Sequence, residues 1–324
     1  MLFLILIITA LAACFLFFNF GYSIFNAYAG ENLAQPLADG QNRLAGAVAN
    51  FGVMPAQTYP ALYPEYNLPR NEDKIIVPTK KSSAVDLQIF ASSSMAIDKK
   101  SGAILWNKNS GEPRPIASIT KLMTAEVFLN TNPDWDKVYQ LAKEDIRSGG
   151  KSYIYPGDEV KVKDLFYLML VGSDNTAAVA LAKSTGLSEE EFVARMNERA
   201  KQFGLENTFF ADVSGLSSKN ISPAKEVLIM ARKCLAKQEI RAATLESTYE
   251  FTTTGGRKVA VQSTDYLLSA FPVDGINIVG GKTGHTDEAG YCFVGDFKNE
   301  AGQEMLSVVM GTGTNEDRFA ATKK

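Results

Sequence analysis

The pattern of hydrophobic and polar positions divides the chain into three parts, and the first is an apolar leader. Residues 2–18 are almost wholly apolar, and the run through Phe25 is long enough to span a membrane. Ala27-Tyr-Ala29 matches the small-residue pattern of a signal-peptide cleavage site, and Leu11-Ala-Ala-Cys14 has the local shape of a lipoprotein signal. We therefore predict a signal peptide or membrane anchor over residues 1–29. Each alternative places the rest of the chain outside the cytoplasm.

The second part, residues 30–86, is predicted to be a proline-rich spacer. Proline fixes φ and lacks an amide hydrogen, so frequent prolines exclude long helices and central strands. They recur through residues 51–78, at Pro55, Pro60, Pro64, Pro69 and Pro78. We expect a semi-extended tether, with room for one short helix around residues 42–50.

Regular structure is predicted from Leu87 onward. Residues 87–97 and 103–106 are expected to form a β-hairpin around a turn at residues 98–102. A helix is expected from Ser118 to about Leu129. Its residues are apolar nearly all round, which is typical of a helix that is buried on every side.

A block of further helices follows. Hydrophobic periodicity predicts helices at about 163–171 and 175–183. Ser188-Glu-Glu-Glu191 is a capping box that opens a helix to about Phe203. Ser222 and Pro223 are expected as the N-cap and first residue of a helix that runs to about Lys237.

From Thr248 the hydrophobic period changes to two, which predicts β-strands. The expected strands are at 249–253, 258–262, 276–283, 291–296 and 305–310. A strand pair, a helical block and then more strands indicate an α+β domain over residues 87–324. We expect its antiparallel sheet to be completed by both ends of this region.

Composition narrows the functional classes. The 324 residues, of which 46% are hydrophobic, suffice for one large domain with extensions. The net charge is only −3 and no basic block is present, so we predict no nucleic-acid partner. The three cysteines, Cys14, Cys234 and Cys292, are far apart and imply no disulfide framework. The single histidine, His285, excludes a metal site built from several histidines, and we predict neither metal nor cofactor.

The first candidate for chemistry is Ser118-Ile-Thr-Lys121. Positions i and i+3 lie on one face of a helix, so the lysine amine can reach the serine hydroxyl. A serine becomes a useful nucleophile when a base removes its proton. Burial and a second cation, for which Lys282 is a candidate, would keep Lys121 neutral part of the time. Backbone N–H groups at the helix start would favour a developing oxyanion.

Two more motifs follow in the chain. Ser173-Asp-Asn175 lies between two predicted helices, where Ser173 is placed to relay a proton from Lys121 to a leaving amine and Asn175 to hold a substrate amide. Asp174 is expected to be solvated or structural. Lys282-Thr-Gly284 ends a predicted strand after two glycines, and a peptide can pair with such a strand. Each motif alone more often marks a capping turn or a hairpin.

Together, however, the three motifs resemble a known family. Ser-x-x-Lys, Ser-x-Asn and Lys-Thr-Gly in this order are shared by penicillin-binding proteins and class A β-lactamases. Arg114–Ala125 and Gly281–Cys292 resemble the corresponding segments of serine D-alanyl-D-alanine carboxypeptidases, the low-molecular-mass penicillin-binding proteins. The likeness covers about residues 87–324.

The resemblance implies a penicillin-binding transpeptidase/β-lactamase-like fold, with an antiparallel sheet flanked by helices plus a helical subdomain. It implies removal of the terminal D-Ala from peptidoglycan stem peptides through an acyl-enzyme on Ser118, with β-lactams as covalent inhibitors. The expected catalytic residues are Ser118, Lys121, Ser173 and Asn175. The expected substrate-binding residues are Lys282, Thr283, Gly284, His285 and Thr286. By the same likeness, the backbone N–H groups of Ser118 and His285 form the oxyanion hole, and His285 is not a base.

The chain also departs from the family pattern. Ser173-Asp-Asn175 is the class A β-lactamase form of the second motif, yet no Glu-x-x-Leu-Asn loop accompanies it, and Glu206 does not fit. The family often places an arginine beside the carboxylate pocket after the last strand, where Gly311–Thr314 stands here, so we expect Thr286 and Lys282 to meet the substrate carboxylate. The chain stops in what should be the last helix, which we expect to be truncated. A D,D-endopeptidase, a weak transpeptidase and a β-lactamase on the same scaffold remain the alternatives.

Overall fold

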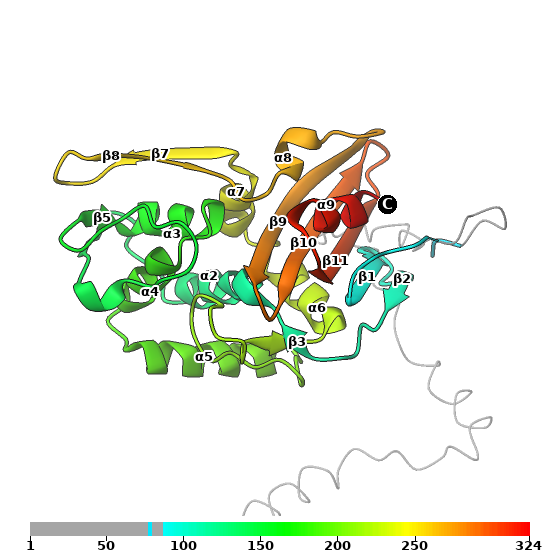
Figure 1. Ribbon diagram of the computed structural model, residues 1–324, viewed down its shortest axis with the longest axis horizontal. Coiled ribbons are helices and arrows are strands. Elements are labelled where there is room, and N and C mark those ends of the chain that lie inside the picture. Colours follow the sequence, from blue (N-terminus) through cyan, green and yellow to red (C-terminus); the bar gives the residue numbers. More distant parts are fainter. Residues whose placement is uncertain (1–76, 80–86) are drawn as a thin grey trace, which may run out of the picture. The chain divides into compact units, whose positions relative to one another are not determined.

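The computed structural model describes residues 77–79 and 87–324 (Figure 1). The predicted leader at 1–29 and nearly all of the spacer at 30–86 lie outside these residues. Within the described ranges, no helix has the length and apolar character needed to cross a membrane.

The main sheet has five antiparallel strands in the order β2-β1-β11-β10-β9. The first hairpin, β1 and β2, lies beside the last strand, and Ser93 is paired with Met310. The prediction that both ends of the domain complete one sheet is therefore confirmed (Figure 1). The strands are β1 (Ser93–Asp98), β2 (Ile104–Lys108), β9 (Ile276–Thr286), β10 (Gly290–Asn299) and β11 (Glu304–Thr312).

Alternation along the strands sorts side chains onto two faces of the sheet. On β10, Cys292 and Val294 belong to the large core shared with the helical block, whereas Phe293 packs with Phe319 of the C-terminal helix on the other face. Helices α6 (Ala224–Cys234) and α7 (Gln238–Leu245) contact the first face. Helix α9 (Asn315–Lys323) covers the second face and lies across β10 and β11 in Figure 1. Helix α8 (Leu267–Ala270) adds Leu267 to the cluster on that face.

The helical subdomain surrounds α2 (Lys121–Leu129), which is buried from Lys121 to Phe128 as its apolar sequence predicted. Its other helices are α3 (Val162–Val171), α4 (Asn175–Ser184) and α5 (Glu189–Gln202). The capping box of α5 is confirmed, because the Ser188 hydroxyl accepts from the Glu191 amide while the Glu191 carboxylate accepts from the Ser188 amide.

Three predictions need correction. The turn before α2 is a separate 3₁₀ helix, η1 (Ala117–Thr120), rather than the first turn of an α-helix. Ser222 is not an N-cap, because it pairs with Arg114 in a short ladder and α6 begins after Pro223. The predicted single helix from Ser222 to Lys237 is in fact α6, which ends at Cys234, followed by the unforeseen α7.

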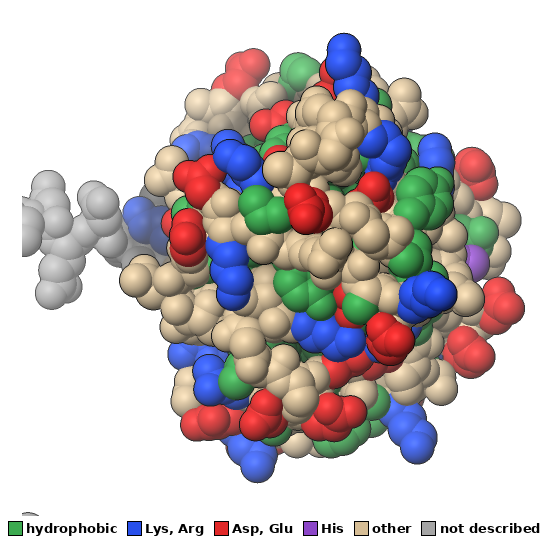
Figure 2. Space-filling model, turned by 90° about the vertical axis from the view of Figure 1, so that its left-hand side faces the viewer, with side chains coloured by type: hydrophobic (Ala, Val, Ile, Leu, Met, Phe, Trp, Pro, Cys, Tyr) green, Lys and Arg blue, Asp and Glu red, His purple; other side chains and the backbone are tan. Residues whose placement is uncertain are grey.

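Short strands complete the architecture. Strands β7 (Thr248–Thr252) and β8 (Lys258–Gln262) were predicted, but they form their own two-stranded sheet beside the helices (Figure 1). The remaining short elements are β3 (Arg114–Pro115), β4 (Val138–Gln140), η2 (Lys143–Asp145), β5 (Glu159–Lys161) and β6 (Ile221–Ser222). Figure 2 shows acidic and basic side chains interspersed on one face of the described residues, so that face offers no continuous basic surface to a polyanion.

Candidate active site

The three sequence motifs meet around one cavity of about 520 Å³. Ser118 comes from η1, Ser173 from the turn between α3 and α4, and Asn175 from the first position of α4. The third motif comes from β9. Of the predicted site residues, those that line the cavity are Ser118, Ser173, Asn175, Thr283, Gly284, His285 and Thr286. Lys121 and Lys282 are fully buried behind its wall.

The Lys121 amine is held by three acceptors. Its Nζ lies 2.8 Å from Ser118 Oγ, 2.6 Å from Asn175 Oδ1 and 2.7 Å from the Ser214 carbonyl oxygen. The amide and carbonyl oxygens can only accept, whereas the serine hydroxyl can also donate. A neutral amine would therefore give its two hydrogens to Asn175 and Ser214 and turn its lone pair toward the Ser118 hydroxyl.

Electrostatics make that neutral form accessible. Burial lowers the pKa of Lys121 to about 7, against the opposing pull of the Asp174 and Asp212 carboxylates. We expected Lys282 to assist as a second cation. Burial and then the charges of Lys121 and Arg318 lower the pKa of Lys282 itself well below its usual value, so burial rather than a second cation acts on Lys121.

The turn before α4 fixes the second motif. Asp174 is buried and caps α4 by accepting from the Ala177 amide at 2.9 Å, so it is structural rather than solvated. The Asn175 side chain is held at both ends, because its Nδ2 donates to the Gly149 carbonyl at 2.6 Å while its Oδ1 accepts from Lys121. Ser173 adopts a positive φ of 57°, a strained backbone conformation for a non-glycine residue.

The partner of Ser173 differs from the prediction. Its Oγ accepts from Lys282 Nζ at 2.9 Å, and no direct bond joins it to Lys121 among the described contacts. The Lys282 amine also donates to the Thr283 carbonyl at 3.0 Å. Lys282 thus points at the second motif rather than into the cavity, and the expectation that it meets a substrate carboxylate directly is wrong for this arrangement.

Close packing explains the glycine of the third motif. A Cβ on Gly284 would lie 2.8 Å from the Ile116 carbonyl oxygen and 3.2 Å from the Ser118 nitrogen. Thr283 Oγ1 lies 2.5 Å from Thr264 Oγ1, which also lines the cavity. His285 is exposed and stacks on Tyr291 with ring centroids 3.9 Å apart. Among the described contacts, the hydrogen bond of the Ser118 hydroxyl is with Lys121 and not with His285.

An arginine that the sequence argument missed lines the cavity. Arg318 comes from α9 and is almost fully buried, and its Nη1 donates to the carbonyls of Gly284 at 3.0 Å and Cys292 at 3.2 Å. Burial lowers its pKa to about 10, which leaves it a cation at neutral pH. The expectation that this pocket lacks an arginine is therefore wrong.

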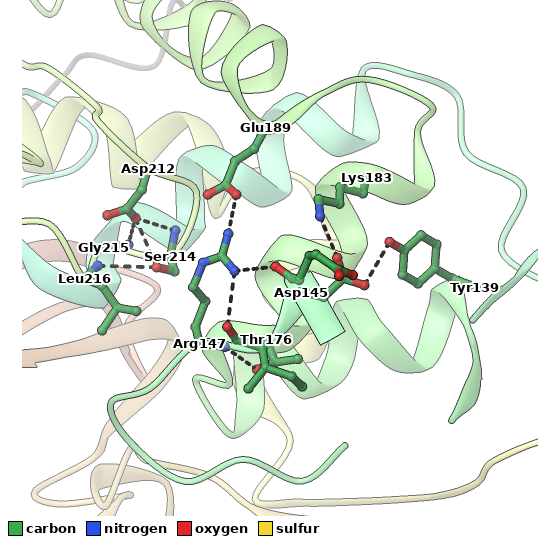
Figure 3. Close-up of polar contacts among 12 residues, drawn as sticks. Tyr139, Asp145, Arg147, Thr176, Lys183, Glu189, Asp212, Ser214, Gly215 and Leu216 are labelled. Atoms are coloured by element: carbon green, nitrogen blue, oxygen red, sulfur yellow. Dashed lines mark hydrogen bonds and ion pairs between the residues drawn. The ribbon is translucent and has the colours of Figure 1, made fainter. Parts of the chain in front are cut away.

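A polar network anchors the loop that holds Asn175 (Figure 3). The Asp145 carboxylate accepts from Tyr139 Oη at 3.0 Å and from Lys183 Nζ at 2.7 Å. Two residues further on, the Arg147 amide donates to Thr176 Oγ1 at 3.1 Å. These contacts fix the backbone just before Gly149, whose carbonyl orients the Asn175 amide.

Comparison with known proteins identifies the family. The sequence profile of the D-alanyl-D-alanine carboxypeptidases matches residues 79–314, which is most of the chain. The chain belongs to this family. The resemblance stated from the three motifs and the predicted fold class are both confirmed.

The relatives of this chain include proteins named as carboxypeptidases and proteins named as endopeptidases. The carboxypeptidase DacF of Bacillus subtilis is 34% identical over 243 residues, which cover 72% of this chain and 60% of DacF. A D-alanyl-D-alanine endopeptidase of Haemophilus influenzae is 35% identical over 230 residues, which cover 70% of this chain and 77% of that protein. The chain thus spans less than two thirds of DacF.

Solved structures show the same fold. The Streptomyces K15 DD-transpeptidase superposes with a TM-score of 0.68 at 25% identity, and the match covers 74% of this chain and 97% of that one. Penicillin-binding protein D2 of Listeria monocytogenes, solved in a cefotaxime-bound form, gives a TM-score of 0.64 at 32% identity, with the same coverage. Among the described residues of this family member, no cluster of acidic, cysteine or histidine side chains has the makings of a metal site.

Proposed function

We propose that the protein is a serine D,D-carboxypeptidase that removes the terminal D-Ala from peptidoglycan stem peptides through an acyl-enzyme on Ser118. The observation that carries the proposal is the contact between Ser118 Oγ and a fully buried lysine amine whose other two partners can only accept. An enzyme of this kind acts outside the cytoplasm, where its substrate lies.

The proposed acylation begins with proton transfer from Ser118 to neutral Lys121. The serine oxygen then attacks the carbonyl of the penultimate D-Ala, and the bond to the terminal D-Ala nitrogen breaks. Ser173 gives its hydrogen to that leaving nitrogen. The proton taken from Ser118 then passes from Lys121 to neutral Lys282 and on to Ser173, whose Oγ lies 2.9 Å from Lys282 Nζ, so the protons balance. Water later hydrolyses the ester and restores the free hydroxyl.

Backbone geometry supports the proposed oxyanion hole. The Ser118 amide lies at the cavity, in the 3₁₀ turn that begins with Ala117, whose φ is +46°. Gly284 brings β9 against this turn, so the amide of the following residue, His285, borders the same space. Two fixed N–H groups beside the attacked carbonyl would stabilise the charge that develops on its oxygen.

The pH dependence of acylation follows from the Lys121 pKa. Only the neutral amine accepts the Ser118 proton, so activity is present above the pKa and is lost as the pH falls through it. With a pKa of about 7, the neutral fraction at pH 6 is about one tenth and at pH 5 about one hundredth. The rate of acylation by a chromogenic cephalosporin, measured by stopped flow between pH 5 and 9, should fall at acidic pH in the same way. We call this fall the acid limb of the profile. A flat profile would contradict the role of Lys121.

Arg318 is proposed to bind the substrate carboxylate, because it is a buried cation that lines the cavity. Hydrogen bonds between an arginine and a carboxylate are stronger than those between neutral groups. Thr283 and Thr286, which carry hydroxyl donors, also line the cavity. Arg318→Leu should raise KM for a free pentapeptide by ~10-fold or more while leaving hydrolysis of its C-terminal amide nearly unchanged.

Matched assays separate that effect from a loss of structure. Arg257→Leu, which removes an arginine from the β7–β8 hairpin outside the cavity, serves as the control. If Arg318→Leu lowered turnover of the acid and the amide equally, the carboxylate would be read elsewhere.

Endopeptidase activity is the second candidate, favoured by the relative from Haemophilus influenzae. The leaving group would then be a second stem peptide rather than a single D-Ala. A side-by-side assay of a pentapeptide and a cross-linked peptide dimer decides between them, and we expect faster release of D-Ala. β-Lactamase activity has less support, because Glu206 lines a different hollow, with Phe209, and not the candidate active site.

A further inference from the structure

Asp212 organises a loop that no sequence motif marked. It lies between α5 and β6, and its carboxylate accepts four hydrogen bonds from the residues that follow it. Figure 3 shows those from Ser214 and Gly215. Oδ1 accepts from the amide of Ser214 at 2.8 Å, from its hydroxyl at 3.0 Å and from the Gly215 amide at 2.6 Å. Oδ2 accepts from the Ser217 amide at 2.6 Å. The Asp212 carboxylate thus fixes the backbone of residues 214–217.

This loop touches both halves of the nucleophile–base pair. The Ser214 carbonyl accepts from Lys121 Nζ at 2.7 Å. Gly215, at a φ of +88°, lies so close to η1 that a Cβ there would be 2.0 Å from the Ala117 carbonyl oxygen and 2.9 Å from the Ser118 nitrogen. The backbone just before the nucleophile is therefore braced by the same loop that orients the base.

We propose that Asp212 is a positioning residue for acylation: its carboxylate holds the Ser214 carbonyl as a fixed acceptor for Lys121 and holds Gly215 against the backbone of Ser118. The proposal rests on the proposed function in one respect, that Lys121 is the base for Ser118. Asp212 itself does not line the cavity and need not touch the substrate.

The charge of Asp212 gives this role a signature. Although burial opposes it, hydrogen bonds from the Ser217, Gly215 and Ser214 amides keep the pKa of Asp212 below its usual value, so the group is an anion at neutral pH. The carboxylates that face Lys121 are Asp212 from this loop and Asp174 from the cap of α4, and both raise its pKa. A buried amine whose charge interacts with that of Lys121 is Lys282 on β9.

Asp212→Asn removes the charge and replaces one acceptor by a donor that would face the Ser217 amide. We expect the second-order constant for acylation by a chromogenic cephalosporin to fall by ~10-fold or more. We also expect the midpoint of the acid limb to move to lower pH, by roughly half a unit to one unit. Circular dichroism and thermal unfolding establish that the variant is folded.

The matched control is Asp136→Asn, which removes an exposed carboxylate paired with Lys161 at the surface. It should leave both the acylation constant and the midpoint at wild-type values. If Asp212→Asn does not fold, Asp212→Ser takes its place, because a serine hydroxyl supports the same kind of turn more weakly.

The outcomes are distinct. Slower acylation with a lower midpoint supports the proposal. A wild-type midpoint in a folded variant, whatever its rate, would overturn it, and so would failure of both variants to fold, because Asp212 would then be purely structural. If the wild-type protein itself formed no acyl-enzyme, the proposed function rather than the role of Asp212 would fail.

Discussion

Ser118→Ala is expected to lose D-Ala release and β-lactam acylation by ~10⁴-fold or more, the scale of loss when a catalytic serine is removed. The alanine keeps the 3₁₀ turn but has no oxygen to attack a carbonyl. Among the described residues the hydroxyl makes one hydrogen bond, with Lys121 at 2.8 Å, so the fold should persist. Release of D-Ala from a pentapeptide, followed by an amino-acid oxidase assay, measures the loss.

Ser269→Ala is the matched control for that variant. Ser269 is exposed on α8 and its hydroxyl donates to the Tyr266 carbonyl, away from the cavity. It should retain wild-type turnover. Retained turnover in Ser118→Ala would place the nucleophile at another residue.

Lys121→Arg is expected to have the second largest effect, a loss of ~10³-fold in acylation. A guanidinium keeps its proton at any pH at which proteins work, so it cannot take the Ser118 hydrogen. It is also larger than the amine it replaces at a fully buried position with three short contacts. The rate of adduct formation with benzylpenicillin, followed by mass spectrometry, reports this step alone.

A second variant separates the loss of the base from the steric effect of the larger arginine side chain. Lys121→Met removes the amine while filling a similar volume, and should be as inactive as the arginine variant. Lys161→Arg, at an exposed position, is the neutral control. Appreciable acylation in both Lys121 variants would mean that another group serves as base.

The sequence predicted the fold well where local patterns decide it. Period-two alternation located β9, β10 and β11, and the capping box at Ser188 located the start of α5. Local patterns do not determine which strands share a sheet. In the described part of the chain, β7 and β8 pair only with each other and not with the main sheet. They also did not predict the positive φ of Ala117. That residue packs closely against Gly215, which is distant in the sequence.

The site was predictable where its geometry is local. Ser118 and Lys121 are three residues apart on one helical face, so their contact could be expected from spacing alone. The pairing of Lys282 with Ser173 could not, because it depends on how β9 packs against the α3–α4 turn. Each motif was recognisable, but the assignment of partners between motifs required the tertiary structure.

Arg318 and Asp212 were missed for a related reason. Arg318 is on α9, beyond the last strand, and only the packing of that helix brings it to the cavity. Asp212 belongs to a loop, and the one local signal was Asp212 two residues before Ser214-Gly215, a pattern typical of an Asx turn. That signal predicts a turn, but it does not indicate that the Ser214 carbonyl accepts a hydrogen bond from Lys121.

Identifying the residue that becomes acylated tests directly whether Ser118 is the nucleophile. The wild-type protein is incubated with benzylpenicillin and the reaction is quenched. The intact mass is then measured, and the modified residue is located by proteolysis and tandem mass spectrometry. We predict one adduct per chain, with the mass of the whole β-lactam, on Ser118. An adduct on any other residue, or none at all while D-Ala is still released, would contradict this prediction.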